Sequence, residues 1–422
     1  MQSPNAGNDP GSGQKENKES YHMKKILIAI IALSFVAVTA QAQEKYVAGG
    51  FEMAGHVNVG AGYEHFSNKP TTYFTNDGDV GYFAGPVGKY LGTAPAAKSD
   101  HFSFFVDEVE LDIMKSFGEN VRLRADLDFG RVASSGLFSN AFNLEQAYAT
   151  ANIPVGNGIE FLIGRFNAPV GFEAVDMNDN DTISFSVLRT GLRPANMTGM
   201  KIYYPFSDLV DLHFYVVNTL YQDSDVKVND VPSLGFRLGF NWGEEGTEST
   251  FGVSGMFGPE SQMSNKHFTY VGDIDVNWWI TESFALGLEG LIGRTNAVTN
   301  TTGVVGPGQN TWYYGGLLNL HYVFSDVWDG TLRYAFALQK KFGPVALGGG
   351  GPVNQLGLPK MDLTGTQQQI HQITLAGGYA IADGAKLKLE GRFDMIKPAV
   401  AAAVVPGTQY VMGGALAFAY DF

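Results

Sequence analysis

The sequence predicts an all-β fold: a transmembrane, antiparallel, up-and-down β-barrel of about 16 strands, within a range of 14 to 18. Three observations support this fold. Runs of about ten residues alternate large apolar side chains with polar or small ones along most of the chain. Short and long connections between these runs follow one another in turn. The last run, 409–422, ends in the aromatic residue Phe422, which is typical of the closing strand and assembly signal of bacterial outer-membrane barrels.

Two N-terminal segments are expected to lie outside the fold. Residues 23–42 form a secretory signal peptide with two lysines, an apolar run too short to span a bilayer, and a small-residue cleavage site between Ala42 and Gln43. Residues 1–22 are polar and form an extension that we do not expect in the mature protein. The remaining residues, 43–422, show no break in composition, so we expect one barrel domain.

Sixteen segments carry the strand-like alternation. They are 51–64, 102–114, 121–130, 144–153, 159–166, 198–204, 210–218, 233–242, 249–257, 268–280, 284–293, 311–324, 328–338, 370–381, 385–395 and 409–422. The short connections are 115–120, 154–158, 205–209, 243–248, 281–283, 325–327 and 382–384. The intervening connections are mostly longer, notably 65–101, 167–197, 294–310 and 339–369. Short periplasmic turns that alternate with long external loops are a property of outer-membrane barrels.

Composition limits the classes of function. The chain has no cysteine, which excludes disulfides and thiolate sites. Its net charge of −14 argues against nucleic acid as a partner. The mean hydropathy is −0.05, and no mature segment has the length and apolarity of a transmembrane helix. A secreted chain with this profile is either a soluble β protein or a membrane barrel, and the regular order of short and long connections favours the barrel.

The alternation assigns the charged side chains to the inside of the barrel. In the segment 121–130, for example, Leu123 and Leu127 alternate with Arg124 and Asp126. An Arg or Lys in the middle of a lipid-facing strand costs roughly 2–4 kcal/mol, so the charged face should line water. The expected pore-lining residues are Glu108, Glu110, Asp112, Arg122, Arg124, Asp126, Asp128, Asp273, Asp275, Glu390 and Arg392. The same parity also places Glu289, Arg333 and Lys388 inside, and acids outnumber bases on this face, which favours cations mildly.

The turn 115–120 sets the expected register of the two strands beside it. It places Asp112 opposite Arg122 and Glu110 opposite Arg124, as a charged ladder along the pore wall. The two arginines then either help to select solutes or only neutralise the acids of the wall.

Aromatic residues gather at both ends of the expected strands. Trp242, Trp278 and Trp328 lie close to short turns, whereas Trp312 and Phe129 lie close to long connections. Two aromatic belts are typical of a protein that meets two membrane interfaces.

The third long connection, 167–197, is the expected constriction of the channel. Its charged residues are acidic in the first half and basic in the second: Glu173, Asp176, Asp179, Asp181, Arg189 and Arg193. Opposed clusters across a constriction would create a transverse field that favours polar over apolar solutes. The alternative is that these charges only solvate an exposed loop.

No metal site and no cofactor are expected. The run 176–181, DMNDND, has alternating oxygen ligands reminiscent of a calcium loop, but Asp181 replaces the required Gly and Val187 stands where the bidentate Glu belongs. An ordinary turn rich in Asp and Asn is therefore favoured. The histidines are dispersed along the sequence, without metal-ligand spacing.

One part of the chain resembles a known family. It comprises Glu145-Gln146-Ala147-Tyr148, the turn 154–158, the run 164–173 (GRFNAPVGFE) and residues 198–205. These residues resemble the OmpL-like β-barrel porins and, more weakly, the phosphate-selective porins. Family members typically have His-Thr-Gly where this chain has Met197-Thr198-Gly199, so the family's histidine has no counterpart here. The resemblance implies passive diffusion of small hydrophilic solutes and ions through a water-filled barrel in the outer membrane of a Gram-negative bacterium.

Two other functions stay open from the sequence: a surface adhesin or structural barrel, and an outer-membrane phospholipase with a lipid-facing Ser and His. No enzymatic activity is expected. The expected partners are outer-membrane lipids, the barrel-assembly machinery through Phe422, and small hydrophilic solutes. Strands rich in Gly and Ala, such as 147–151, offer a flat contact surface that favours a homotrimer.

Overall fold

The computed structural model describes residues 46–48, 50–66, 100–129, 142–221, 230–260, 265, 268–296, 310–339, 368–397 and 408–422. They all belong to one unit, Gln43–Phe422. The expected extension and signal peptide, 1–42, lie outside the described residues, as do most of the long connections 65–101, 294–310 and 339–369. The assignments of those N-terminal segments stay predictions. Among the described residues, no helix combines the length and apolar character needed to cross a membrane.

The described residues form β-strands almost throughout. The strands are β1 (Tyr46–Ala48), β2 (Phe51–Phe66), β3 (Asp100–Phe117), β4 (Val121–Phe129), β5 (Phe142–Ile153), β6 (Ile159–Asn167), β7 (Asn196–Pro205), β8 (Val210–Val217), β9 (Ser233–Trp242), β10 (Ser249–Pro259), β11 (Phe268–Thr281), β12 (Phe284–Asn296), β13 (Asn310–Ser325), β14 (Trp328–Gln339), β15 (Gln368–Ala382), β16 (Ala385–Lys397) and β17 (Gln409–Asp421). A short helix, α2 (Val187–Gly191), lies between β6 and β7.

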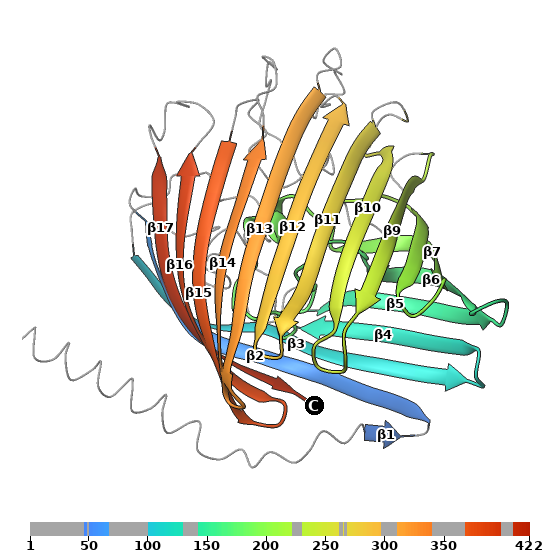
Figure 1. The fold of residues 1–422 in the computed structure, drawn as a ribbon, viewed down its shortest axis with the longest axis horizontal. Coiled ribbons are helices and arrows are strands. Elements are labelled where there is room, and N and C mark those ends of the chain that lie inside the picture. Colours follow the sequence, from blue (N-terminus) through green and yellow to red (C-terminus); the bar gives the residue numbers. More distant parts are fainter. Residues whose placement is uncertain are drawn as a thin grey trace, which may run out of the picture. The chain divides into compact units, whose positions relative to one another are not determined.

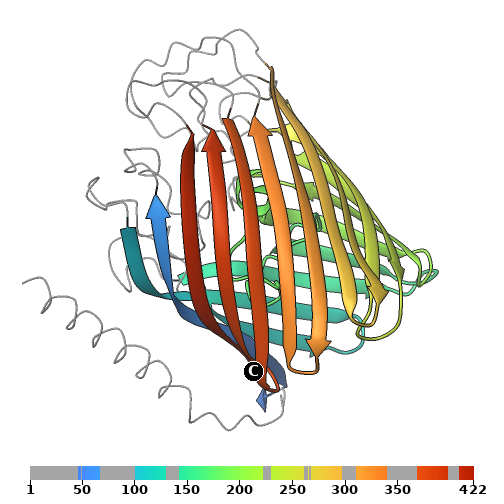
Figure 2. The same ribbon diagram turned by 60° about the vertical axis from the view of Figure 1, so that its left-hand side comes forward.

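Strands β2 to β17 close into a 16-stranded barrel (Figures 1 and 2). Each strand pairs antiparallel with the next one along the chain, and β17 returns to pair with β2, where Ala415 lies opposite Gly62. Closure satisfies the backbone hydrogen bonds of every strand and removes the sheet edges, which a barrel in hydrocarbon requires. The predicted fold class and strand count are confirmed. The short strand β1, which pairs with the start of β2, was not predicted.

The C-terminal residue takes part in closing the ring. The N–H of Phe422 donates to the carbonyl of Gly55, and the N–H of Gly55 donates to the carbonyl of Phe422, both at 2.9 Å. A Cβ at Gly55 would lie 2.2 Å from the carbonyl oxygen of Glu110 and 2.9 Å from the Phe422 ring. A glycine is therefore needed where β2 passes between β3 and the end of β17.

The hairpin between β3 and β4 is tighter than the sequence indicated. β3 continues to Phe117, which pairs with Val121. The turn between them begins with Gly118 at φ +64°, a conformation that glycine adopts without strain. Extra pairing at the turn end of β3 shortens the connection expected over 115–120.

This shorter turn makes the expected ladder of opposite charges wrong. Asp112 lies opposite Asp126 in place of Arg122, and Glu110 lies opposite Asp128 in place of Arg124. The register differs from the expected one by an even number of residues, so every side chain keeps its expected face. The error therefore concerns partners, not orientation.

The outer face of the barrel carries exposed apolar side chains. Leu375 in β15 and Leu389 in β16 are each 64% exposed, whereas the inward-facing Asp126 is 0% exposed. The exposed aromatic residues near the strand ends include Trp242, Trp278, Trp312, Trp328 and Phe129. A soluble β protein would show the reverse arrangement, with its apolar face covered.

A hydrophobic core lies inside the barrel, near the ends of the strands that carry the long connections. Its wall members are inward residues of ten strands: Leu162, Phe166, Met197, Tyr215, Val217, Met256, Val271, Leu291, Tyr313, Leu317, Ala335, Ala337, Ile370 and Val411. They pack with Val187, Leu188 and Leu192 of the α2 region. The sequence-based expectation of a polar inner face therefore fails in this half of the barrel, because the inner wall here covers a packed loop.

We predict that Leu389→Arg, near the middle of the outer face of β16, lowers the free energy of unfolding in lipid vesicles by about 2–4 kcal/mol, because it puts a charge against hydrocarbon. Denaturant titration measures this change. The matched control is Val327→Arg at a short turn, where the cost should fall to about 0–1 kcal/mol. Equal costs at both positions would contradict a lipid-facing outer surface.

Candidate functional site

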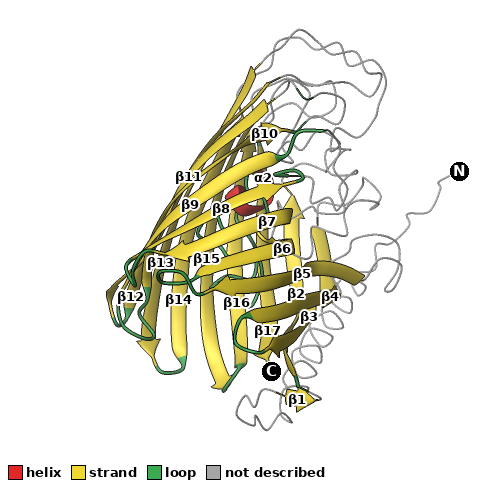
Figure 3. Cartoon of the chain, turned by 90° about the vertical axis from the view of Figure 1, so that its right-hand side faces the viewer, coloured by secondary structure: helices red, strands yellow, loops and turns green. Residues whose placement is uncertain are grey.

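The connection between β6 and β7, residues 168–195, lies inside the barrel. Its ends are held together, because Asn167 pairs with Asn196 and the N–H of Ala168 donates to the carbonyl of Ala195 at 2.7 Å. Figure 3 shows α2 within the ring of strands, and α2 contacts β13, β14 and β15. We call residues 168–195 the inner loop.

Backbone N–H groups of the inner loop donate to side chains of the wall. The N–H of Met177 donates to Glu108 of β3 at 2.7 Å, and the N–H groups of Ile183 and Ser184 donate to Glu390 of β16 at 2.7 and 3.0 Å. These bonds satisfy loop donors and wall carboxylates at the same time, which removes the cost of burying either unpaired. The inner loop is therefore bonded to β3 and β16, which are separated in the ring by β17 and β2 only.

Wall cations bind carbonyl oxygens of the same loop. Lys388 of β16 donates to the carbonyls of Asn180, at 2.5 Å, and Asn178, at 3.2 Å. Arg392 donates to the carbonyl of Phe185 at 3.0 Å and to Asp394 at 2.8 Å. Wall carboxylates thus accept from N–H groups of the loop, and wall cations donate to its carbonyl oxygens.

Glu173 of the inner loop is buried in a network with Arg333 of β14. The two side chains form an ion pair, and each is 2% exposed. Arg333 also donates to the hydroxyl of Thr182 at 2.6 Å. Glu173 accepts hydrogen bonds from the N–H and hydroxyl of Ser186, the N-cap residue of α2. This pair links the start of α2 to the wall.

Arg193, at the other end of the inner loop, pairs with Glu289 of β12 at 3.4 Å, and both side chains are buried. Glu289 also accepts from the N–H of Phe172 at 2.7 Å. Arg189 is buried, and its guanidinium lies 4.9 Å from the centre of the Phe185 ring. Neither a transverse field across open water nor an exposed, solvated loop describes Glu173, Arg189 and Arg193.

The acidic run of the inner loop forms a local turn, as the sequence favoured. Oδ1 of Asn180 accepts from the N–H of Ala174 at 3.0 Å, and its amide donates to the carbonyl of Asp176 at 2.6 Å. Burial raises the pKa of Asp176, since it penalises the charged carboxylate. Asp181 is partly exposed and accepts from Asn319 of β13 at 3.0 Å.

All the expected pore-lining residues lie at inward positions, but most of them are covered. Glu108, Glu110, Asp126, Asp128, Asp273, Asp275, Glu390 and Arg392 are each at most 4% exposed. Arg124 pairs with Asp126 at 2.7 Å and with Asp112 at 3.4 Å, so it neutralises wall acids from a diagonal position. Asp275 receives two hydrogen bonds from Arg237 of β9.

The sequence-based prediction did not include Gln372 and Asn319 among the site residues. Gln372 of β15 accepts from the N–H of Val187 at 2.5 Å, and Asn319 contacts Asp181. Both are uncharged, and only their inward parity could have indicated a contact. Parity also placed Arg333 and Lys388 inside, but no sequence signal connected them with the inner loop.

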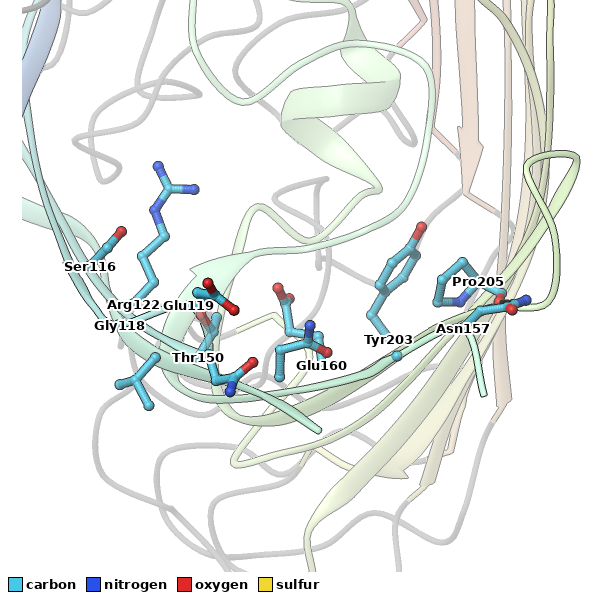
Figure 4. Close-up of a pocket in the computed structure, with 13 residues that line it drawn as sticks. Ser116, Gly118, Glu119, Arg122, Thr150, Asn157, Glu160, Tyr203 and Pro205 are labelled. Atoms are coloured by element: carbon cyan, nitrogen blue, oxygen red, sulfur yellow. Dashed lines mark hydrogen bonds between the residues drawn. The ribbon is translucent and has the colours of Figure 1, made fainter. Parts of the chain in front are cut away.

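A cavity of about 400 Å³ lies near the short turns of β3 to β8. Figure 4 shows Arg122, Glu160 and Tyr203 projecting into the same space. Ser116 and Thr150 line the same space (Figure 4). Asn152 of β5 completes the polar lining. This cavity offers a polar, water-accessible surface with both signs of charge.

We predict that Arg333→Ala lowers the free energy of unfolding by about 3–5 kcal/mol, because it leaves Glu173 buried without its cation. Denaturant titration, with the folded fraction measured by mobility on unheated SDS gels, gives the value. The double variant Arg333→Ala with Glu173→Gln should lose clearly less, since no unpaired charge remains. If single and double variants unfold alike, the pair does not hold the inner loop.

Several solved structures share this fold. The outer membrane channel DcaP of Acinetobacter baumannii matches with a TM-score of 0.57 at 11% identity, over 90% of this chain and 100% of that one. An anion-selective porin from Comamonas acidovorans matches with a TM-score of 0.54 at 13% identity, over 88% and 99%. A loop-deletion mutant of OmpT of Vibrio cholerae matches with a TM-score of 0.52 at 9% identity, over 88% and 99%. At these identities the likeness concerns the fold alone.

The sequence itself shows the family. A search of curated proteins gave no significant match. A family described as "Putative beta-barrel porin-2, OmpL-like" matches residues 50–420, which covers every strand from β2 to β17 except the last residue of β17. The resemblance seen around 145–205 is thereby confirmed over nearly the whole barrel. The chain belongs to this family of OmpL-like β-barrel porins, and it is a porin for passive diffusion of solutes.

Proposed function

We propose that this porin passes small hydrophilic solutes and ions across the outer membrane of a Gram-negative bacterium, and that the inner loop narrows its channel. The observation that carries the proposal is the position of the inner loop, whose α2 segment packs on β13 to β15. A 16-stranded barrel is wide enough for an aqueous channel. A loop that fills one side leaves the passage beside the opposite wall.

The water-accessible part of the passage is expected along the short-turn ends of β4 to β9, because Phe166, Tyr215 and Val217 belong to the hydrophobic core nearer the other ends. Inward side chains in this region keep contact with water: Arg122 is exposed, Arg124 is 27% exposed and Arg237 is 15% exposed. Lys201 and Glu160 are partly exposed as well. The polar cavity beside Arg122 and Glu160 would be the periplasmic end of this passage.

Ion preference then depends on these water-accessible residues. The excess of acids on the inner wall, which favoured cations, consists largely of side chains that are at most 4% exposed. A buried acid with protein partners contributes less to the potential of the passage than a water-facing charge at the narrowest point. Arg122 and Glu160 are therefore the stronger candidates for setting the selectivity.

The family match favours a porin over an outer-membrane phospholipase, although one histidine, His371 of β15, shares the outward face of its strand with Ile373 and Leu375. A phospholipase would need a Ser and His facing lipid. His213 lies at an inward position beside Asp211, and His321 is buried with its Nδ1 2.9 Å from the hydroxyl of Thr331. An adhesin or structural barrel would depend on the long external loops, which lie outside the described residues.

The proposed partners follow from the surface of the barrel. Lipids would contact the exposed apolar face, and the assembly machinery would recognise the terminal strand that ends in Phe422. Three successive outward positions of β5, Ala147, Ala149 and Ala151, carry small side chains, which supports close packing in a homotrimer.

We predict ohmic, long-lived openings when the protein is reconstituted in planar bilayers. Since Ala168 and Ala195 are hydrogen-bonded, residues 169–194 can be replaced by an Asn-Gly turn without moving β6 or β7. The single-channel conductance of this variant should be at least about twofold higher than that of the natural chain, because a wider lumen remains. A closed natural barrel would contradict the porin function. Unchanged conductance after loop replacement would instead contradict the constriction.

We predict opposite selectivity shifts for two neutral variants of the cavity. Arg122→Gln should raise the permeability ratio of K⁺ to Cl⁻, and Glu160→Gln should lower it, each on the order of twofold at low salt. Reversal potentials in a KCl gradient measure both. The two variants serve as controls for each other, and shifts of the same sign or no shift would place the passage elsewhere.

A further inference from the structure

The geometry points to a calcium site between the wall and the inner loop, with Glu110 of β3, Glu145 of β5 and Asp176 of the inner loop as ligands. One ligand oxygen of each residue lies within 4.8 Å of the other two. Oxygens bound to one Ca²⁺ lie about 2.4 Å from it, so they are up to about 4.8 Å apart. Three carboxylates from three chain segments thus lie close enough together to share one ion.

A β-bulge brings Glu145 into this group. Asp126 pairs with Gln146 and Leu127 with Leu144, so Glu145 is the extra residue of β5. Glu145 and Gln146 are consecutive, yet they are only 3% and 7% exposed. A regular strand would have turned one of them outward, and bulges commonly re-aim a side chain in this way.

Glu110 supplies a second observation that favours a cation at this position. The side chain is 2% exposed, and among the described residues its Oε2 has no hydrogen-bond partner. Oδ1 of Asp176 also has no hydrogen-bond partner among the described residues. A buried carboxylate is costly unless a cation or donors compensate it.

Two neighbouring trios of carboxylates are weaker candidates. One contains Asp112 and Asp126, which already pair with Arg124. The other contains Glu108, which lies 3.0 Å from Nε2 of His56 and accepts from the N–H of Met177. The trio with Asp176 is therefore the position where an added divalent ion compensates most charge.

The ion would fasten the acidic end of the inner loop to β3 and β5. Protein contacts hold the rest of the loop on the other side, through Arg333, Lys388 and Glu289. From the run DMNDND only Asp176 takes part, so the site differs from a linear calcium loop. Its existence does not depend on conduction, so its test is separate from that of the porin function.

The test is calcium titration of the purified, chelator-treated barrel in detergent, by calorimetry. One Ca²⁺ per chain should bind to the natural protein, and Glu110→Gln and Asp176→Asn should each weaken binding at least tenfold. Asp181→Asn is the matched control, since it makes the same chemical change in the same loop outside the trio. Absence of binding, or equal binding by all four proteins, would overturn the proposal.

A stability measurement keeps the proposal testable if a variant alters the fold. In EDTA, Glu110→Gln should raise the unfolding temperature because it relieves repulsion among buried carboxylates. In excess Ca²⁺ the order should reverse, because only the natural protein gains the binding free energy. If Ca²⁺ leaves the unfolding temperature of the natural protein unchanged, there is no such site.

Discussion

The structure depends on one constraint: a chain that crosses hydrocarbon must satisfy all of its backbone hydrogen bonds within the protein. This chain does so by pairing β17 with β2, and the terminal residue Phe422 completes the ring through two bonds to Gly55. Once the ring is closed, each strand has one face toward lipid and one toward the interior. The alternation of the sequence is the direct consequence, because only the inner face can hold charge at low cost.

The inner face creates a second requirement. Carboxylates at inward positions, such as Glu108, Glu289 and Glu390, are buried and need donors. The inner loop supplies these donors from its own N–H groups, while its carbonyls accept from Lys388 and Arg392. A segment with little regular structure is thus held by polar bonds that the wall also needs, which explains why it is ordered inside the barrel.

The sequence predicts those features of the barrel that depend on local alternation along a strand. Parity along a strand assigns each residue to a face, so the fold, the strand count and the inward position of residues such as Arg124 could be read directly. The register depends on turn length, and a turn shorter than expected gave Asp112 the wrong partner. Contacts across the lumen, such as Arg333 with Glu173, join residues far apart in sequence and leave no local signal.

The inner wall is divided along its length, and this division supports the proposed position of the passage. Near the long connections, inward apolar residues such as Leu317 and Ala335 pack on Leu188 of the α2 region. Packing of this kind excludes water and fixes the inner loop against β13 to β15. Arg122 and its neighbours on the opposite wall carry charges that face water. Under the proposed function, solute choice would depend on a few side chains there, which lie outside the buried network that holds the loop.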